Sequence, residues 1–425
     1  MKLRKILIVG RGGREHALAS KFKQSVIETE VFVAPGAFGI ENSIAIDEND
    51  FDGLISFAKK ESIDLTVVGP EVPLVNGIVD RFQQENLAIW GPCANAAVIE
   101  GSKAFAKDMM KKYGIPTAAY EVFSDYDTAC RYLDTVKVPI VVKADGLAAG
   151  KGVVIAQSKK EACEALEEIL VQGKFDELGK GSNNNRQVVI EEYMVGEEFS
   201  FIALVAGERV IPMALAQDHK RAFDNDEGPN TGGMGAYSPV PQISEDIVKR
   251  AVDEILLPTA QAMVQEKRPF YGFLFAGLIA TDQGPKVIEF NARLGDPEAE
   301  VLLPRLENDL FEVIIGLLDE RVPQVELKWS PNSVVGVVLA SKGYPGVYEV
   351  GFPISGLDDL EKDTFIFHCG VGENNLTAGG RVLLVARMEK DLASAQEAVY
   401  KEISKIKCNN LFYRKDIGNK AKWCG

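Results

Sequence analysis

Three polar residues, Glu289, Asn291 and Arg293, alternate with apolar residues at the end of a predicted strand. Because side chains two positions apart project from the same face of a strand, the three are expected to share one face. Carboxylate and amide oxygens suit a hard cation such as Mg²⁺, and a guanidinium there could reach a phosphoryl group during its transfer. Two acids, Asp296 and Glu298, follow in the next turn. The segment predicts a metal and phosphate site, and a half-exposed strand with ordinary polar side chains is the alternative.

A glycine-rich loop, Ala144–Gly152, follows another predicted strand and contains Gly146, Gly150, Lys151 and Gly152. It resembles a Walker A loop, but its glycines have the wrong spacing, and Gly152 stands where a serine or threonine would hold magnesium. The residues after it are β-branched, which favours a second strand rather than a helix. A loop between two strands can fold over a polyphosphate, and a flexible hairpin tip is the alternative.

Two lysines flank the expected nucleotide cleft: Lys103 starts a predicted helix and Lys143 ends a predicted strand. An ammonium at either place can neutralise phosphate oxygens, although each lysine taken alone is typical of a solvated surface. Backbone groups, a carboxylate and an apolar side chain at a further strand end could meet an adenine ring. The residues there are Glu191, Glu192, Tyr193 and Met194, which alone do not differ from an ordinary strand end.

The N-terminal loop Gly10–His16 follows a strand, opens a helix and includes Gly12, Gly13 and Arg14. Its N–H groups and the helix dipole make a natural anion site. The loop fails the G-x-G-x-x-G pattern of a dinucleotide site, because Glu15 takes the last glycine position and no acid ends the second strand. A contact with a phosphate or another substrate group is therefore favoured over a tight structural turn, and NAD binding is disfavoured.

Two polar, glycine-rich segments, Gln217–Arg221 and Gly228–Gly235, interrupt a region that otherwise buries much of its chain, as functional loops do. The chain has 3 histidines, which argues against a zinc site built from histidines. One of them, His219, could be a structural hydrogen-bonding residue.

Strands alternate with helical stretches up to about residue 92, which predicts a parallel, doubly wound sheet. A helix from Ser102, short strands and a polar surface loop at Lys174–Arg186 lead to a long helix at Glu245–Glu266. Two strands, Phe273–Ala280 and Pro285–Asn291, close this central region. The remaining strands and a last helix indicate a small C-terminal α+β or β-sandwich-like domain.

The chain has 425 residues, enough for about three domains, and its 46% hydrophobic and 26% charged residues are typical of a globular protein. A net charge of -15 repels nucleic-acid backbones and anionic lipid, so we expect no nucleic acid and no membrane as partners. The 6 cysteines form no C-x-x-C pair, and the N-terminal apolar run is too short for a signal or membrane segment. These features predict a cytoplasmic location with reduced thiols.

Together these segments resemble the phosphoribosylamine-glycine ligase family, also called glycinamide ribonucleotide synthetases, of the ATP-grasp superfamily. The resemblance covers nearly the whole chain. The matching motifs, in the family's order, are Gly12–Ala17, Val68–Pro73, Gly101–Lys103, Lys143–Gly152, Gln217–Arg221, Gly228–Tyr237, Glu289–Glu298, Gly379–Leu383 and Arg414–Gly418.

The resemblance implies an α/β and α+β protein of three domains. These would be a Rossmann-like parallel sheet at 1–101, an ATP-grasp domain at 102–328 with a mobile lid at about 120–190, and a small β-rich C-terminal domain at 329–425. The implied activity joins glycine to 5-phosphoribosylamine in de novo purine biosynthesis, giving glycinamide ribonucleotide, ADP and phosphate through glycyl phosphate. ATP with Mg²⁺ or Mn²⁺ would be used, and we expect a monomer.

Site residues carried over from the family fall into four groups. ATP would be held by Lys103, Lys143, Gly146, Gly150, Lys151, Gly152, Glu191, Glu192, Tyr193, Met194 and Glu198, and the metal by Glu289 and Asn291. Arg293, Lys220 and Asp296 would be catalytic, and Gly12, Gly13, Arg14, Asp218, His219, Asn230, Thr231 and Arg381 would bind substrate.

Two features bear on this comparison. The segment Phe273–Ala280 lacks the acid that binds metal in other ATP-grasp enzymes, so more water ligands are expected. The Asn-rich stretch Ser182–Asn185 lengthens the lid loop beyond the family pattern.

Three other functions stay open at this stage. Another ATP-grasp carboxylate-amine ligase or a carboxylase would share the lid and the metal strand, but its pocket loops should differ. An NAD oxidoreductase rests on the first loop alone. A non-catalytic nucleotide-binding module would not need Lys143, Glu289, Asn291 and Arg293 together.

Overall fold

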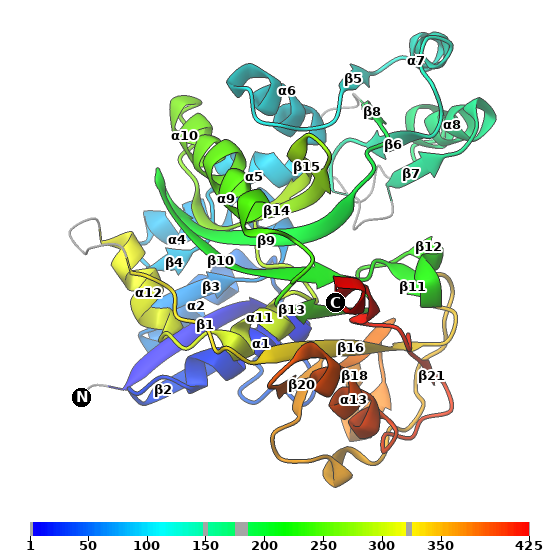
Figure 1. Cartoon of the computed structure of the whole chain (residues 1–425). Helices are drawn as coiled ribbons and strands as arrows, with labels where there is room; N and C mark the ends of the chain where they lie inside the picture. The colour runs from blue at the N-terminus through cyan, green and yellow to red at the C-terminus, as the bar shows by residue number, and fades with distance from the viewer. Residues whose placement is uncertain (1–2, 148–151, 175–185, 320–324, 425) are drawn as a thin grey trace.

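The computed structural model describes residues 3–147, 152–174, 186–319 and 325–424. Within these ranges the chain forms one parallel sheet, one long antiparallel sheet and a smaller antiparallel sheet that projects from the body of the molecule (Figure 1).

The first sheet has the order β2-β1-β3-β4 and is parallel throughout, as predicted. Its strands are β1 (Arg4–Gly10), β2 (Thr29–Pro35), β3 (Leu65–Val68) and β4 (Ile89–Trp90). The surrounding helices are α1 (Gly13–Lys23), α2 (Phe51–Glu61), α3 (Glu71–Val75), α4 (Ile78–Gln84) and α5 (Ala94–Gly101). The central strands are buried on both faces, which is why β1 carries the apolar run Ile6–Val9 and β3 is apolar except for Thr66.

The central region is built on the long hairpin of β9 (Glu197–Ala206) and β10 (Arg209–Asp218), which had not been predicted. Strands β14 (Tyr271–Thr281) and β15 (Gly284–Asn291) extend it beyond β9. The predicted long helix is present as α9 (Glu245–Ala251) and α10 (Leu257–Gln265), joined by the π-helical turn η3 (Val252–Leu256). Helix α6 (Lys103–Tyr113) packs near α10 and β15.

The C-terminal strands continue this sheet instead of forming a separate sandwich, so that alternative was wrong. Strand β13 (Gly235–Ser238) pairs with β10 on one side and with β16 (Ser333–Ser341) on the other. Beyond β16 come β20 (Arg381–Glu389) and β17 (Phe365–His368), while β21 (Leu411–Phe412) also pairs with β16. Nine of the described strands therefore form one sheet across two predicted domains.

Other elements flank this sheet. They are the ribbon of β11 (Arg221–Phe223) and β12 (Glu227–Asn230), the ribbon of β18 (Val371–Gly372) and β19 (Leu376–Thr377), and the helices α11 (Ala299–Leu302), α12 (Leu310–Leu318) and α13 (Leu392–Ile403).

The projecting sheet is formed by the segment predicted as the lid and has the order β5-β8-β6-β7 (Figure 1). Its strands are β5 (Tyr120–Phe123), β6 (Ile140–Ala144), β7 (Val153–Ala156) and β8 (Val188–Glu192), and its helices are α7 (Tyr126–Leu133) and α8 (Lys159–Leu166), which continues into η1 (Glu167–Val171). Its buried apolar residues form a cluster of their own. Because β6 and β7 are antiparallel neighbours, the glycine-rich loop joins two strands, as predicted. The Asn-rich stretch Ser182–Asn185 lies outside the described residues.

Among the described residues no helix is long and apolar enough to cross a membrane.

The junction of the two halves of the long sheet yields a stability prediction. Gly235 has φ +152°, and a Cβ there would lie 2.6 Å from the Gly336 carbonyl oxygen of β16. We expect Gly235→Ala to lower the free energy of unfolding by about 1–3 kcal/mol more than a control substitution, because this backbone oxygen cannot move away. The control is Gly114→Ala, which also has a positive φ (+68°) but meets nothing within 4 Å. Equal unfolding temperatures for the two variants, measured by calorimetry, would contradict this account of the junction.

Candidate active site

The two predicted metal ligands lie at the end of β15, and both are half-buried. The strand has an extra residue at Ile288, whose carbonyl oxygen accepts a hydrogen bond from Lys143 Nζ at 3.0 Å. Glu289 follows this bulge directly, and Asn291 is the last residue of the strand. The prediction that Arg293 shares the same strand face was wrong, because β15 ends before it.

Positive charge surrounds the first of these ligands. Burial opposes ionisation of Glu289, but the charges of Lys220, Lys143, Lys103 and Arg293 outweigh burial and hold the pKa of its carboxyl below the usual value. The lysines come from β6, α6 and the turn after β10. Segments far apart in the sequence thus direct cations at one carboxylate.

This oxygen-rich strand end fits a divalent cation. An ionised Glu289 and the Asn291 amide supply the oxygen ligands that Mg²⁺ and Mn²⁺ accept. In the described parts of the chain, no three His, Cys, Asp or Glu side chains are grouped so that they could hold a metal by themselves. A metal here would therefore need phosphate and water oxygens as well, as Mg²⁺ sites in phosphoryl-transfer enzymes do.

A buried chain of charges connects the lid to this strand. Lys143 Nζ lies 3.0 Å from the Glu191 carboxylate, and Lys107 Nζ of α6 lies 2.9 Å from it. All three side chains are buried. The Glu191 carboxylate, which the sequence suggested for adenine, is therefore engaged with two lysines.

The neighbours of Glu191 are more open. The Glu192 carboxylate accepts the Ala119 N–H at 3.0 Å, and the side chains of Tyr193 and Met194 are exposed and half-buried respectively. Glu198 on β9 is exposed, and its carboxylate lies 3.8 Å from Lys220 Nζ. These side chains can meet a ligand without breaking a buried contact.

The base of the glycine-rich loop is bound to the N-terminus of α6. Lys103 Nζ donates to the Gly146 carbonyl at 2.8 Å. The Asp145 carboxylate accepts from Ser102 Oγ at 3.2 Å and from the Ala104 N–H at 3.0 Å. The lysine predicted to bind phosphate is thus held by the loop predicted to cover phosphate.

Across the loop, Gly152 is buried and its carbonyl accepts from the Ala144 N–H at 2.8 Å. The predicted ATP contacts Gly150 and Lys151 lie outside the described residues.

Arg293 is bound to the first domain. Its Nε lies 3.2 Å from Glu71 Oε2, and its Nη2 lies 3.3 Å from Glu100 Oε1. Glu100 also accepts the Ala292 N–H at 2.7 Å. Two carboxylates therefore fix this guanidinium immediately after the metal strand.

The end of β10 and the turn after it carry three predicted site residues in different environments. Burial raises the pKa of Asp218 to about 7. The imidazole of His219 is turned into the protein, where its Nε2 accepts the Gly418 N–H at 3.2 Å and burial lowers its pKa to about 3. The pKa of Lys220 is raised, because nearby carboxylates, Asp218 foremost, outweigh the effect of burial.

The predicted substrate loops converge on Asp296. Arg381 Nη1 lies 2.9 Å from Asp296 Oδ1 and donates to the Gly232 carbonyl at 2.8 Å. A Cβ built on Gly12 would lie 3.3 Å from Asp296 Oδ2, so the N-terminal loop also lies against this turn. Thr231 Oγ1 donates to the Lys220 carbonyl at 2.9 Å. Asn230 ends β12 in the same loop and is half-buried.

The N-terminal loop is contacted by a carboxylate of the protein itself. The Glu15 carboxylate accepts from the Gly12 N–H and, at 2.6 Å, from Arg14 Nε, and it is almost fully buried. Gly13 lies against Glu300, because a Cβ there would meet its Oε1. One N–H of the predicted anion loop, that of Gly12, is therefore already bound by an acid of the protein itself.

The sequence reasoning missed Lys107, Glu100, Asp145 and the role of Glu15. A signal was available for Lys107, because it lies four residues after Lys103 on one helix and so shares its face. Glu15 also had a signal, because a glutamate three residues after the N-cap can accept the N-cap N–H. Glu100 and Asp145 have partners in distant segments, and sequence spacing does not indicate such pairs.

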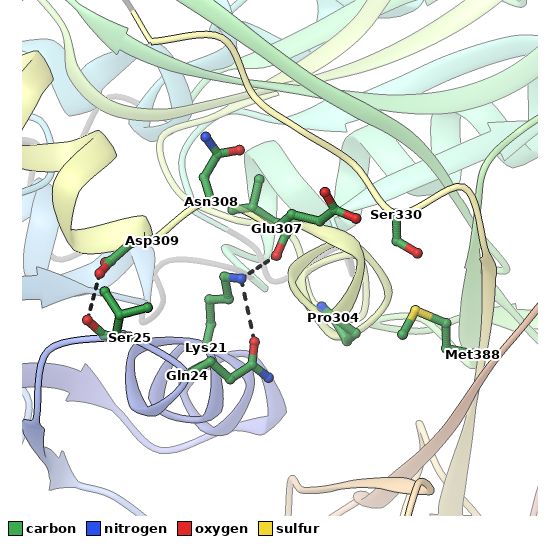
Figure 2. Close-up of a pocket in the computed structure, with 11 residues that line it drawn as sticks. Lys21, Gln24, Ser25, Pro304, Glu307, Asn308, Asp309, Ser330 and Met388 are labelled. Carbon is green, nitrogen blue, oxygen red and sulfur yellow. Dashed lines mark hydrogen bonds between the residues drawn. The ribbon is translucent and has the colours of Figure 1, made fainter.

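A cavity with a volume of about 400 Å³ lies elsewhere in the structure (Figure 2). Lys21 points into it from α1, donates to the Leu306 carbonyl, and lies 3.5 Å from Gln24 Oε1. None of the predicted site residues lines this cavity, so it is not the site described above.

Comparisons with known proteins match this architecture. The chain matches Phosphoribosylglycinamide synthetase in three parts: the N domain over residues 4–100, the ATP-grasp (A) domain over 101–299 and the C domain over 334–420. It is 58% identical to a phosphoribosylamine-glycine ligase of Halalkalibacterium halodurans over 422 residues, covering 98% of this chain and 97% of the relative.

Two solved structures extend the comparison. The phosphoribosylamine-glycine ligase of Thermotoga maritima is 33% identical, with a TM-score of 0.81 over 97% of this chain and 100% of that one. The biotin carboxylase domain of the Hydrogenobacter thermophilus 2-oxoglutarate carboxylase, solved with MgADP, ADP and bicarbonate, is 15% identical. Its TM-score is 0.72 over 96% of this chain and 91% of that one, a likeness of fold alone.

The raised pKa of Asp218 gives a testable pH dependence. Between about pH 4 and pH 7 the folded protein keeps a proton that the unfolded chain releases, so the stabilisation present at low pH is lost as pH rises through 7. Asp218→Asn has no such proton and should not lose this stabilisation. We therefore expect the unfolding free energy of the variant, relative to that of the unaltered protein, to increase as pH rises from 4.5 to 7.5. Urea unfolding measures this, with Asp282→Asn in the exposed turn before β15 as control. Parallel pH profiles for all three proteins would be the contrary outcome.

Proposed function

Since the chain belongs to the phosphoribosylglycinamide synthetase family, we infer that it joins glycine to 5-phosphoribosylamine in purine biosynthesis, with ATP as the energy source. The observation that carries this inference is the convergence of four cationic side chains on Glu289 at the end of the predicted metal strand. Transfer of a phosphoryl group between two anions needs charge neutralisation and positioning of this kind.

In the proposed reaction a glycine carboxylate oxygen attacks the γ-phosphorus of ATP and ADP leaves. The amine of phosphoribosylamine then attacks the carbonyl carbon of glycyl phosphate, loses a proton, and displaces phosphate. Lys103, Lys143 and Lys220 lower the repulsion between the carboxylate and the polyphosphate. No covalent enzyme nucleophile is required.

We propose that Glu289 and Asn291 would hold Mg²⁺ or Mn²⁺ when the nucleotide binds. A divalent cation would neutralise phosphate charge and orient the γ-phosphoryl group. The support is the lowered pKa of Glu289 and the pair of oxygen ligands at one strand end. The similarly folded carboxylase domain was solved with MgADP, which supports a divalent cation together with the nucleotide.

Lys103 would exchange its bond with Gly146 for one with a nucleotide phosphate. Because that bond ties the lysine to the glycine-rich loop, nucleotide binding and loop movement would be coupled. A closed loop would also protect glycyl phosphate from water. Glu192, Tyr193, Met194 and Glu198 would border the nucleoside.

The remaining assignments are proposals on the same basis. Asp296 and Arg381 would shape the phosphoribosylamine side of the pocket together with Gly12, Gly13, Arg14, Asp218, His219, Asn230 and Thr231. Arg293, fixed by Glu71 and Glu100, would stabilise charge during transfer. We propose domain limits of 1–101, 102–328 and 329–425, a monomer, and a cytoplasmic location.

The activity is tested by measuring ADP release with glycine and phosphoribosylamine added singly and together. We expect stoichiometric ADP and glycinamide ribonucleotide only when both are present. Glycine-independent ADP release would exclude this function. Release that requires bicarbonate instead would favour a carboxylase.

The metal assignment is tested with Glu289→Ala. We expect it to raise the magnesium concentration needed for half-maximal turnover by at least about tenfold, because it removes the charged ligand, and high magnesium should restore part of the activity. Asn291→Asp keeps an oxygen ligand and should be milder. Asp282→Ala, which removes a carboxylate from the exposed turn before the same strand, is the control. A Glu289→Ala enzyme with unaltered magnesium dependence would shift the metal assignment to another carboxylate, with Asp296 and Glu298 of the following turn as the next candidates.

A further inference from the structure

Lys107 has no place in the reaction above, yet it occupies a central position next to the site. Its side chain is 3% exposed. Its Nζ lies 2.9 Å from Glu191 Oε2 and donates to Thr117 Oγ1 at 2.7 Å. A buried lysine with two close polar partners is costly to place unless it holds those partners in a required arrangement.

Both partners lead to the metal strand. The Thr117 hydroxyl accepts from Lys107 and donates to the Val287 carbonyl of β15 at 2.7 Å. Glu191 leads to Lys143, which donates to the carbonyl of the next residue, Ile288, at 3.0 Å. Two hydrogen-bonded paths therefore run from Lys107 to adjacent carbonyls immediately before Glu289.

These paths cross between separate parts of the fold. Lys107 belongs to α6, Glu191 to β8 and Lys143 to β6 of the lid sheet, and Ile288 to β15 of the long sheet. The lid has its own apolar core, so polar contacts of this kind contribute to fixing its base on the metal strand.

We propose that Lys107 is a positioning residue for the nucleotide: it holds Glu191, and through it the phosphate-binding Lys143, in register with the metal strand. The proposal deepens the proposed function and rests on it for the role of Lys143. Without the Lys107 charge, the buried Glu191 carboxylate would draw the Lys143 ammonium towards itself and away from phosphate.

The charges that face Lys107 give the proposal a pH signature. Burial and repulsion from Lys143 lower the pKa of Lys107 to about 8, although attraction by Glu191 and Glu192 acts in the opposite direction. The centroid of the Tyr120 ring lies 5.9 Å from the Nζ of Lys107, and Lys111 Nζ lies near the same ring. Above about pH 8 the lysine loses its charge and with it the electrostatic hold on Glu191.

The test measures magnesium-ADP binding by calorimetry and the KM values for ATP and glycine in Lys107→Met, Lys107→Arg and Lys111→Met. The last is a matched control, because Lys111 is exposed on the same helix and its Nζ lies 5.6 Å from the centroid of the Tyr120 ring, but no contact with Glu191 is found. We expect Lys107→Met to weaken ADP binding and raise the KM for ATP by about tenfold or more, with the KM for glycine unchanged. Lys107→Arg should restore most of the affinity.

Other outcomes overturn the proposal. It is overturned if Lys107→Met binds magnesium-ADP as tightly as Lys111→Met does, or if its KM values for ATP and glycine rise equally. If Lys107→Met fails to fold, the proposal is tested by comparing the pH dependence of ADP binding in the unaltered protein and in Lys107→Arg. Affinity should fall above pH 8 only in the former, and identical curves would refute the role. ADP binding needs neither glycine nor phosphoribosylamine, so a failure of the proposed ligase activity is distinguishable from a failure here.

Discussion

The site depends on one constraint: several positively charged side chains must lie close together without driving one another apart. Lys103, Lys143, Lys220 and Arg293 all act on Glu289, and they would repel one another without carboxylates between them. Glu191 stands between Lys143 and Lys107, and Glu71 and Glu100 hold Arg293. The result is a site with fixed cations at which an incoming polyphosphate adds the missing negative charge. Such preorganised charge is what phosphoryl transfer between anions requires.

The fold places these charges by joining elements from distant parts of the sequence. The bulge at Ile288 frees a carbonyl for Lys143, and the end of β15 directs Arg293 back to the first domain. The strand β13 links the central and C-terminal strands into one sheet, so that Arg381 reaches Asp296 across a continuous structure. Each predicted domain thus contributes to one site.

Much of this arrangement could be predicted from the sequence, because the parallel sheet, the lid hairpin and the strand carrying Glu289 have clear local patterns. The hairpin β9–β10 could not, because Phe199–Ala206 is apolar except for Ser200 and buried on both faces, so its periodicity does not separate strand from helix. Motif resemblance supplied candidate residues in order. It did not show that Glu191 binds two lysines, because such pairs form only through tertiary contacts. The bond from the Gly12 N–H to Glu15 is local, and a glutamate three residues after the N-cap is a signal for it that was overlooked.

The central claim is that these charges serve phosphoryl transfer from ATP to a carboxylate, followed by displacement of phosphate by an amine. Turnover of glycine labelled with ¹⁸O in its carboxylate tests this claim most directly. The account predicts that one labelled oxygen appears in the inorganic phosphate for each molecule of product formed. Phosphate without label, with glycinamide ribonucleotide still produced, would contradict it.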